Sequence, residues 1–465
     1  MESTTKRIVA IALIAVIGVG IGIGAWVFLA APTSAFSYPG APASRPDVIK
    51  LGVIGDIGEI QGDAAWNGAY FAAKTINEAG GVDIGGTPYY VGVTKEDSDE
   101  SNPNLVLSRG TDAARRLIYD KEVDYALGGF RSEAVLAYME EFMDAEMLFI
   151  DVGASANEIQ GNVIDDYETY KYAWRFMPIN SSSLGGQILT SVSGFILNMN
   201  ATYPNHEVKQ IGILAEALTW TTDLVTAVET YVPVYTGGWA EMLTPILYDV
   251  TLDATAMNTH LASLASDGAD VVIPMISAQG GILMMGQYAL NQYDFLIFGI
   301  DVQGQLDTYW DDSNGDAQYQ VIMQTLHRTA KTSKSIAFWD AFIVEFDHEP
   351  LYIAVGAYDA VMAIQSAIEA TDSMDTLGII AEMETWTTGN AGRPVGVGGH
   401  AAWWPGSHDL VAGYPYGYTL WCQWQSGGTK VVIEAPIPIP PFELYPAALA
   451  TGTYVVAPWV DTAWS

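Results

Sequence analysis

Apolar stretches of strand length alternate with helix-like segments from residue 48 onward, and this alternation constrains the fold more than any other feature. The stretches VIKLGVIG, YYVGVTKED, VDYALGG and EMLFIDVG are separated by segments that should become helical near Ala64, Pro103 and Ser132. Asn102 before Pro103 has the pattern of a helix cap followed by a first-turn proline. Continuously apolar strands separated by helices predict a parallel sheet covered on both faces. We therefore expect one α/β lobe that ends near Asn180.

A second series of the same kind follows. The stretches KQIGILAEA, EMLTPILYDV, ADVVIPMIS and DFLIFGID again have strand character, and helices are expected to start near Thr221, Ala256 and Gly280. Two more helices are expected over 335–346 and 351–370, and YTLWCQWQSGGTKVVIEA has the pattern of a hairpin. The sequence thus predicts an α/β protein with two doubly wound parallel-sheet lobes.

The order of these segments requires three chain crossings, near 177–183, 327–333 and 392–400. A three-segment hinge of this kind lets two lobes close around a ligand. The expected division is 48–178 plus 330–395 for lobe 1, 179–329 plus 396–435 for lobe 2, and a proline-rich C-terminal extension over 436–465 that the sequence assigns to neither lobe.

Composition agrees with two globular domains and excludes one class of partner. The chain has 465 residues, of which 50% are hydrophobic, and it carries 54 Asp and Glu against 19 Lys and Arg. A formal net charge of -35 repels phosphate backbones, so nucleic acid is not an expected partner. Cys422 is the only cysteine, so no internal disulfide can form.

The N-terminus carries an uncharged apolar run over residues 8–30, preceded by Lys6 and Arg7. Such a run can cross a hydrocarbon core about 30 Å thick, and the basic residues before it place the rest of the chain outside the cytoplasm. We expect an uncleaved membrane anchor, with a cleaved signal peptide and a secreted protein as the alternative. Residues 31–47 are rich in Pro, Ala and Ser and have the composition of a tether.

Patterns typical of enzymes are missing from the sequence. Gly52, Gly55, Gly58 and Gly62 follow a strand without the dinucleotide-binding spacing, and neither a P-loop nor a GxSxG turn occurs. The histidines have no tight metal-ligand spacing. We expect no catalytic residues, no metal site and no cofactor.

Polar and glycine-rich segments follow the predicted strands of both lobes. These segments are GGFRSEA, DVGASANE, AEALTWTTD, ISAQGG and GIDVQGQ. In parallel sheets, ligands bind beyond the carboxyl ends of the strands. If the lobes face each other, five loops line one cleft suited to a small polar molecule.

The segment order resembles type I periplasmic solute-binding proteins of ABC importers, the branched-chain amino acid and amide binding family. The opening VIKLGVIGDIGEIQGDAAWNGAYFAAKTINEAGGV is similar to the family's first strand and helix, with matches at Asn67, Gly68, Ala69, Ile76, Asn77, Gly80 and Gly81. KEDSDESNP resembles the family's acidic turn before the second helix, and VGASANEI resembles its PGATNPEL loop. YKYAWRFMPINSSSLGGQ is similar to the first crossing between lobes. The likeness covers about 48–435.

The resemblance implies ligand contacts from lobe 1. In amino-acid binders of this group, a Ser or Thr at the end of the third strand and backbone N–H groups hold the ligand carboxylate. That position falls on Ser132, with Arg131 beside it, and the next loop matches at Ala154 and Ser155. Arg131 departs from the small uncharged residues of the family. It either binds an anionic group of the ligand or forms an ion pair with Glu133 or another nearby acid.

From lobe 2, the resemblance implies an aromatic contact at Trp220 and an acid at Asp301 that pairs with a ligand ammonium. Ser277 and Gln279 lie on the intervening loop. Burial in a core is the alternative for Trp220, and helix capping is the alternative for Asp301.

The expected function is to capture a small polar ligand outside the cytoplasm and to deliver it to an ABC transporter permease. An amino acid is the first candidate for this ligand. The alternative is a sensing ectodomain that presents an amide, urea or small carboxylate to a receptor. The sequence does not choose the ligand, nor does it decide between transport and sensing.

Overall fold

The computed structural model describes residues 36–177, 179–277, 280–436 and 444–465. Residues Phe36–Ser465 form one compact unit. The apolar run over 8–30, proposed as an anchor, and Gln279, proposed as a ligand contact, lie outside the described residues.

The first sheet has six strands and is parallel except at one edge. Its order is β2 (Val82–Ile84), β3 (Thr87–Asp97), β1 (Val48–Gly55), β4 (Tyr125–Gly128), β5 (Phe149–Asp151) and β6 (Ala173–Arg175). Only β2 pairs antiparallel, with β3. Every residue of β4, β5 and β6 is buried, as expected for parallel strands covered on both faces. The connecting helices are α2 (Ile60–Glu78), α3 (Leu107–Arg115) with the π-helical turn Arg116–Asp120, α4 (Ser132–Asp144), α5 (Asn157–Asp165) and α6 (Tyr167–Tyr170).

The second sheet has eight strands and the same parallel centre. Its order is β14 (Thr429–Val432), β13 (Leu420–Gln425), β12 (Val321–Gln324), β11 (Leu296–Asp301), β10 (Val271–Ile276), β7 (Gln210–Glu216) and β8 (Glu241–Met242), and β9 (Ile246–Tyr248) also pairs with β7. The predicted hairpin is present as antiparallel β13 and β14. On β13, the fully buried Cys422 faces Ile322 of β12. The helical segments between β6 and β12, which accompany the second sheet, are α7 (Ser181–Thr202), α8 (Thr219–Tyr235), α9 (Ala254–Ser266), α10 (Gly281–Asn291), the 3-10 turn η2 (Gln303–Gln305) and α11 (Tyr309–Asp312).

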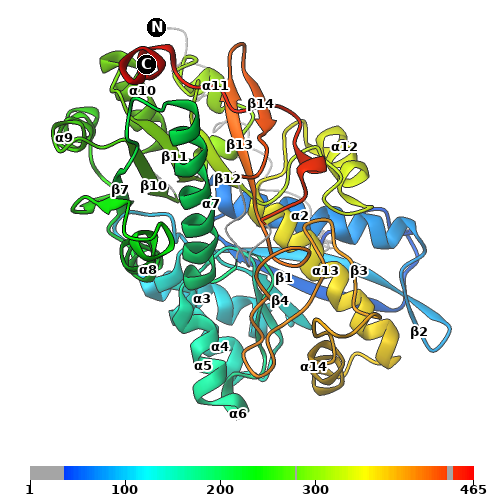
Figure 1. Ribbon diagram of the computed structural model, residues 1–465. Coiled ribbons are helices and arrows are strands. Elements are labelled where there is room, and N and C mark those ends of the chain that lie inside the picture. Colours follow the sequence, from blue (N-terminus) through cyan, green and yellow to red (C-terminus); the bar gives the residue numbers. More distant parts are fainter. Residues whose placement is uncertain (1–35, 178, 278–279, 437–443) are drawn as a thin grey trace, which may run out of the picture. The chain divides into compact units, whose positions relative to one another are not determined.

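The chain passes between the two sheets three times. It leaves the first sheet between β6 and α7, and after β12 it continues into α12 (Ser335–Phe346), α13 (Tyr352–Thr371) and α14 (Thr376–Glu384). Both α12 and α13 contact α2 of the first sheet, and Figure 1 shows α13 in yellow beside α2 in blue. The chain then returns to the second sheet at β13. We propose to divide the described residues into lobe 1 and lobe 2 along these crossings.

The close contact between α2 and α13 depends on Gly68, one of the residues that match the solute-binding proteins this sequence resembles. A Cβ at Gly68 would lie 2.2 Å from the carbonyl oxygen of Ala354 on α13, so only glycine allows this approach. Among the described helices, α13 alone is long and apolar enough to cross a membrane. In its most apolar stretch of 18 residues, 72% are buried inside the protein. We therefore assign α13 to the core of lobe 1.

Two local predictions are wrong. Helix α3 begins at Leu107, not at Pro103. Asn102 does not cap it, because the Asn102 side chain accepts a hydrogen bond from the Asn104 N–H and closes a turn instead (3.0 Å). The stretch EMLTPILYDV forms two short strands, β8 and β9, separated by Pro245, which cannot donate a hydrogen bond to a sheet.

The described part of the C-terminal extension packs on lobe 2. It forms the 3-10 turn Ala447–Leu449 and α15 (Pro458–Trp464). The indole N–H groups of Trp459 and Trp464 donate to the carbonyl oxygens of Tyr293 and Asp294, at 2.9 and 3.1 Å. Both acceptors lie between α10 and β11, so the extension covers this end of lobe 2.

Candidate functional site

A cavity of about 90 Å³ lies at the carboxyl ends of strands from both sheets. Space of this size holds several water molecules or one compact organic molecule. Most of its wall is apolar, with large side chains from both lobes such as Phe130, Met177, Leu184, Leu218, Ile300 and Met323. The cavity is therefore suited to a ligand with an apolar body.

Each of the five strand-end loops contributes to the cavity wall. Arg131 comes from the loop after β4, Ser155 from the loop after β5, Trp220 from the first turn of α8, which follows the loop after β7, Ser277 from the end of β10, and Gln305 from the segment after β11. The loops lie together because parallel strands present their carboxyl ends at the same edge of a sheet.

The predicted ligand residues divide into two groups. Four of them, Arg131, Ser155, Trp220 and Ser277, line the cavity. The other described ones, Ser132, Ala154 and Asp301, are buried outside its lining. The Ser132 hydroxyl oxygen accepts from the Ala156 N–H (3.2 Å), and the Ala154 N–H donates to Asp151 Oδ1 (2.9 Å).

The ion pair that the sequence raised for Arg131 is confirmed. Arg131 Nε donates to Glu133 Oε2 (3.3 Å), and its Nη1 donates to the carbonyl oxygen of Asn102 (3.1 Å). The other oxygen of Glu133 accepts from the backbone N–H of Thr219, the first residue of α8 (3.0 Å). Arg131 therefore lines the cavity while two of its donor nitrogens are engaged by protein groups.

Asp301 is held within lobe 2. Its Oδ2 accepts from the Tyr309 hydroxyl (2.8 Å) and from Gln320 Nε2 (2.7 Å), and burial raises the pKa of this carboxyl. A Cβ on Gly281, the first residue of α10, would lie 2.3 Å from Oδ2. The carboxyl is thus packed against the start of α10.

Glu100 is the most informative site residue that sequence reasoning missed. It lines the cavity and is fully buried, and its Oε2 accepts from the backbone N–H groups of Phe130 (3.2 Å) and Arg131 (3.1 Å). The Ser98 hydroxyl donates to its Oε1 (3.0 Å). Burial raises the pKa of the Glu100 carboxyl to about 8. Glu100 belongs to the acidic turn KEDSDESNP, and this turn was the sequence feature that could have indicated it as a site residue.

Three buried polar atoms in the cavity wall have no hydrogen-bond partner among the described residues: Ser101 Oγ, Trp220 Nε1 and Gln305 Oε1. Trp220 is 8% exposed and Gln305 is 5% exposed. The amide nitrogen of Gln305 donates to the Met323 carbonyl (3.2 Å), which leaves the amide oxygen as the unpaired atom. Buried polar atoms normally have partners, so these three mark positions for polar atoms of a ligand.

Direct hydrogen bonds join the lobes around the cavity. Gln61 Nε2 on α2 donates to the carbonyl oxygen of Ser277 (3.2 Å), and Asn157 Nδ2 on α5 donates to Asp223 Oδ2 on α8 (2.5 Å). Together with the bond from Thr219 to Glu133, they hold residues of the two lobes in direct contact beside the cavity.

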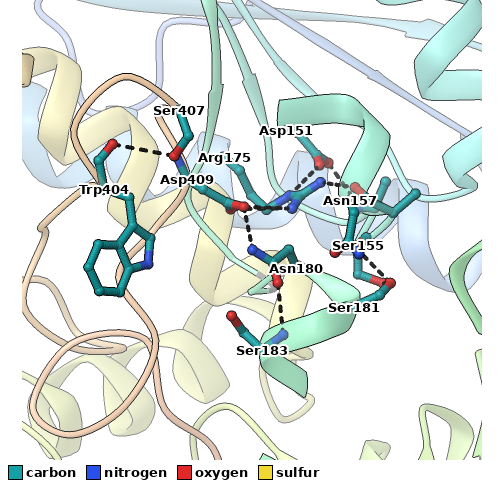
Figure 2. A network of polar contacts seen from close by, with 12 residues as sticks. Asp151, Ser155, Asn157, Arg175, Asn180, Ser181, Ser183, Trp404, Ser407 and Asp409 are labelled. Carbon is teal, nitrogen blue, oxygen red and sulfur yellow. Dashed lines mark hydrogen bonds and ion pairs between the residues drawn. The ribbon is translucent and has the colours of Figure 1, made fainter. Parts of the chain in front are cut away.

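A buried charge network links the cavity loops to the crossings, and Figure 2 shows Arg175 at its centre. Arg175, at the end of β6, donates from Nε to Asp151 Oδ2 and from Nη1 to Asp409 Oδ1, both at 3.2 Å. Asp151 also accepts from Gly153 N, in the cavity wall (3.0 Å). Asp409 accepts from Asn180 Nδ2, at the start of α7 (2.6 Å). Arg175 therefore joins a cavity loop to the first and third crossings.

Within the described ranges, no three His, Cys, Asp or Glu side chains are grouped as ligands for a metal ion.

The comparison with protein families decides the identity of the fold. A model described as periplasmic binding protein matches residues 48–412. The chain belongs to this family. Its resemblance to type I periplasmic binding proteins of ABC transporters is thereby confirmed. Members of this family are solute-binding proteins of transporters, and the location of this periplasmic binding protein is accordingly extracytoplasmic.

Solved structures share the fold of this periplasmic binding protein. A solute-binding protein from R. palustris in complex with benzoate is 16% identical, with a TM-score of 0.64 over 86% of this chain and 98% of that one. Another, from Rhodopseudomonas palustris BisB5 in complex with 3,4-dihydroxybenzoic acid, is 17% identical, with a TM-score of 0.64 over 85% and 99%. LivJ from Streptococcus pneumoniae, in complex with isoleucine, is 16% identical, with a TM-score of 0.61 over 83% and 98%. A comparison with curated proteins finds no match.

Proposed function

We propose that this solute-binding protein captures a compact organic molecule with an apolar body between its lobes and delivers it to the permease of an ABC importer. The observation that carries the proposal is the cavity itself, which is lined from both lobes by strand-end loops and is closed by cross-lobe hydrogen bonds. Closure around a ligand is how a two-lobed protein presents its loaded state to a partner.

An amino acid is the ligand that the sequence resemblance favours. Isoleucine in LivJ and benzoate in the R. palustris protein both have an apolar body, and this supports a small ligand with such a body here. The apolar wall of this cavity suits the body of either molecule.

Binding should be visible as stabilisation of the purified protein in a thermal-shift screen of amino acids, amides and aromatic acids. A ligand at 100 times its dissociation constant adds about 2.7 kcal/mol to the free energy of unfolding. Small-angle scattering with and without each hit should give a smaller radius of gyration in the bound state, because the lobes close. A screen without a stabilising ligand, or an unchanged radius with a saturating one, would contradict this proposal.

We also propose that residues 8–30 hold the protein at the membrane surface, where the permease is. The support is the length and uncharged character of the run and the two basic residues before it. The protein should stay in the membrane pellet after a high-salt wash, because salt does not screen apolar burial. Release into the supernatant, with a mature N-terminus near Phe36, would identify a cleaved signal peptide.

A further inference from the structure

The two backbone N–H groups that lead into α4, those of Phe130 and Arg131, are engaged by a carboxyl group of the protein. Backbone N–H groups at a helix start normally attract an anion. Here, Glu100 Oε2 accepts from both Phe130 N and Arg131 N. An oxygen of this side chain accepts these bonds whether the carboxyl is protonated or ionised. A carboxyl group of the protein therefore occupies the place where a ligand carboxylate would lie.

The other predicted contacts for a zwitterion are also engaged. Arg131 is paired with Glu133, so the pair has no net charge, and the Ser132 oxygen accepts from the Ala156 N–H. The Ser277 hydroxyl donates to Glu216 (2.6 Å). Asp301, the expected partner of an ammonium, is bound by Tyr309 and Gln320 outside the cavity wall.

Three buried polar atoms of the cavity wall stay unpaired: the donor Trp220 Nε1, the acceptor Gln305 Oε1 and the Ser101 hydroxyl, which can donate or accept. A ligand that fills this space must accept a hydrogen bond from the indole and donate one to the amide oxygen. An uncharged group such as a primary amide or an alcohol does both. The formal net charge of -35 adds a general repulsion of anions.

We infer that Glu100 is a specificity-determining residue that excludes carboxylates, so that the cavity selects a compact apolar molecule with an uncharged head, which Trp220 and Gln305 bind. This inference rests on the proposed capture of a small molecule between the lobes and names its chemical class. Neutral amides and alcohols are the members of that class.

Matched pairs of probes test the inference, because each pair differs only in the head group. The pairs are benzoate with benzamide and 3-methylbutanoate with 3-methylbutanamide, titrated into the full-length protein by calorimetry. We expect the amide of a binding pair to bind at least about tenfold more tightly than its carboxylate, since the carboxylate meets the occupied α4 start.

Three variants separate the roles of the residues. Glu100→Ala frees the two N–H groups and should raise carboxylate affinity about tenfold or more. Glu100→Gln keeps an acceptor oxygen at the same place and should keep the preference for the amide. Trp220→Phe keeps an aromatic face but removes the donor, and should weaken amide binding about threefold to tenfold. The wild-type comparison and Trp220→Phe keep the test decisive even if Glu100→Ala does not fold.

Carboxylates or isoleucine binding the wild type at least as tightly as the matched amides would overturn the inference while leaving the proposed capture intact. Unchanged amide affinity in Trp220→Phe would also overturn it. If the thermal-shift screen yields no ligand of any class, the proposed function itself fails, and the two failures are distinguishable.

Discussion

Replacing Arg175 with leucine should lower the free energy of unfolding by about 3–5 kcal/mol, because the change leaves buried carboxylates without their counter-charge. Arg175 and Asp151 are fully buried, and Asp409 is nearly so. The Arg175 Nη2 donor to the Ala156 carbonyl (2.6 Å) is lost at the same time. Urea denaturation followed by tryptophan fluorescence measures the loss.

Arg328→Ala is the matched control for this prediction. Arg328 makes a two-pronged pair with Asp340, at 2.7 and 2.9 Å, but the two side chains are 58% and 48% exposed. Exposed pairs contribute at most about 1 kcal/mol. A loss in Arg175→Leu no larger than that of the control would show that the buried network is not a major source of stability.

The Glu100→Gln variant should lose a pH dependence that the wild type has. Burial raises the pKa of this carboxyl from 4.5 to about 8 in the folded protein. Between these values the folded state holds a proton that the unfolded state releases, so wild-type stability falls as pH rises through this window. The contribution is on the order of 5 kcal/mol at most, and the side-chain amide of the variant cannot titrate.

The measurement is the free energy of unfolding of both proteins at about pH 5 and about pH 8.5. The other titratable groups, including nearby Asp56, are the same in both proteins, so the difference between the two curves isolates Glu100. The variant should gain stability relative to the wild type at the higher pH. Parallel curves would mean that the carboxyl is ionised in the folded protein throughout this range.

Most strands and helices could be predicted from the sequence, because each one depends on the pattern of apolar residues within its own short segment. VIKLGVIG is strand β1 to the residue, and SIAFWDAFIVEF over 335–346 is helix α12 to the residue. Continuous apolar runs are what parallel strands require. The short edge strands β2 and β6 were not predicted, because VDI and AWR do not lie in a longer apolar run such as the one that contains β5.

The site was predictable as a set of loops but not as a set of contacts. Strand order places Arg131, Trp220 and Ser277, which follow the carboxyl ends of three strands, at the cavity. Whether a polar side chain faces a ligand or another protein group depends on three-dimensional partners. Asp301 is bound by Gln320 and Tyr309, and Glu100 reaches across to the α4 start; neither relation is visible from residue spacing.

The buried position of Cys422 on β13 has a practical consequence for following lobe motion. Burial raises the pKa of its thiol to about 12, and only the thiolate form reacts with thiol reagents, so this sulfur is protected from them. No other cysteine exists in the chain. One new cysteine on an exposed position of each lobe would therefore take up a pair of fluorescent dyes without the need to replace Cys422, and energy transfer between the dyes would report opening and closing in real time.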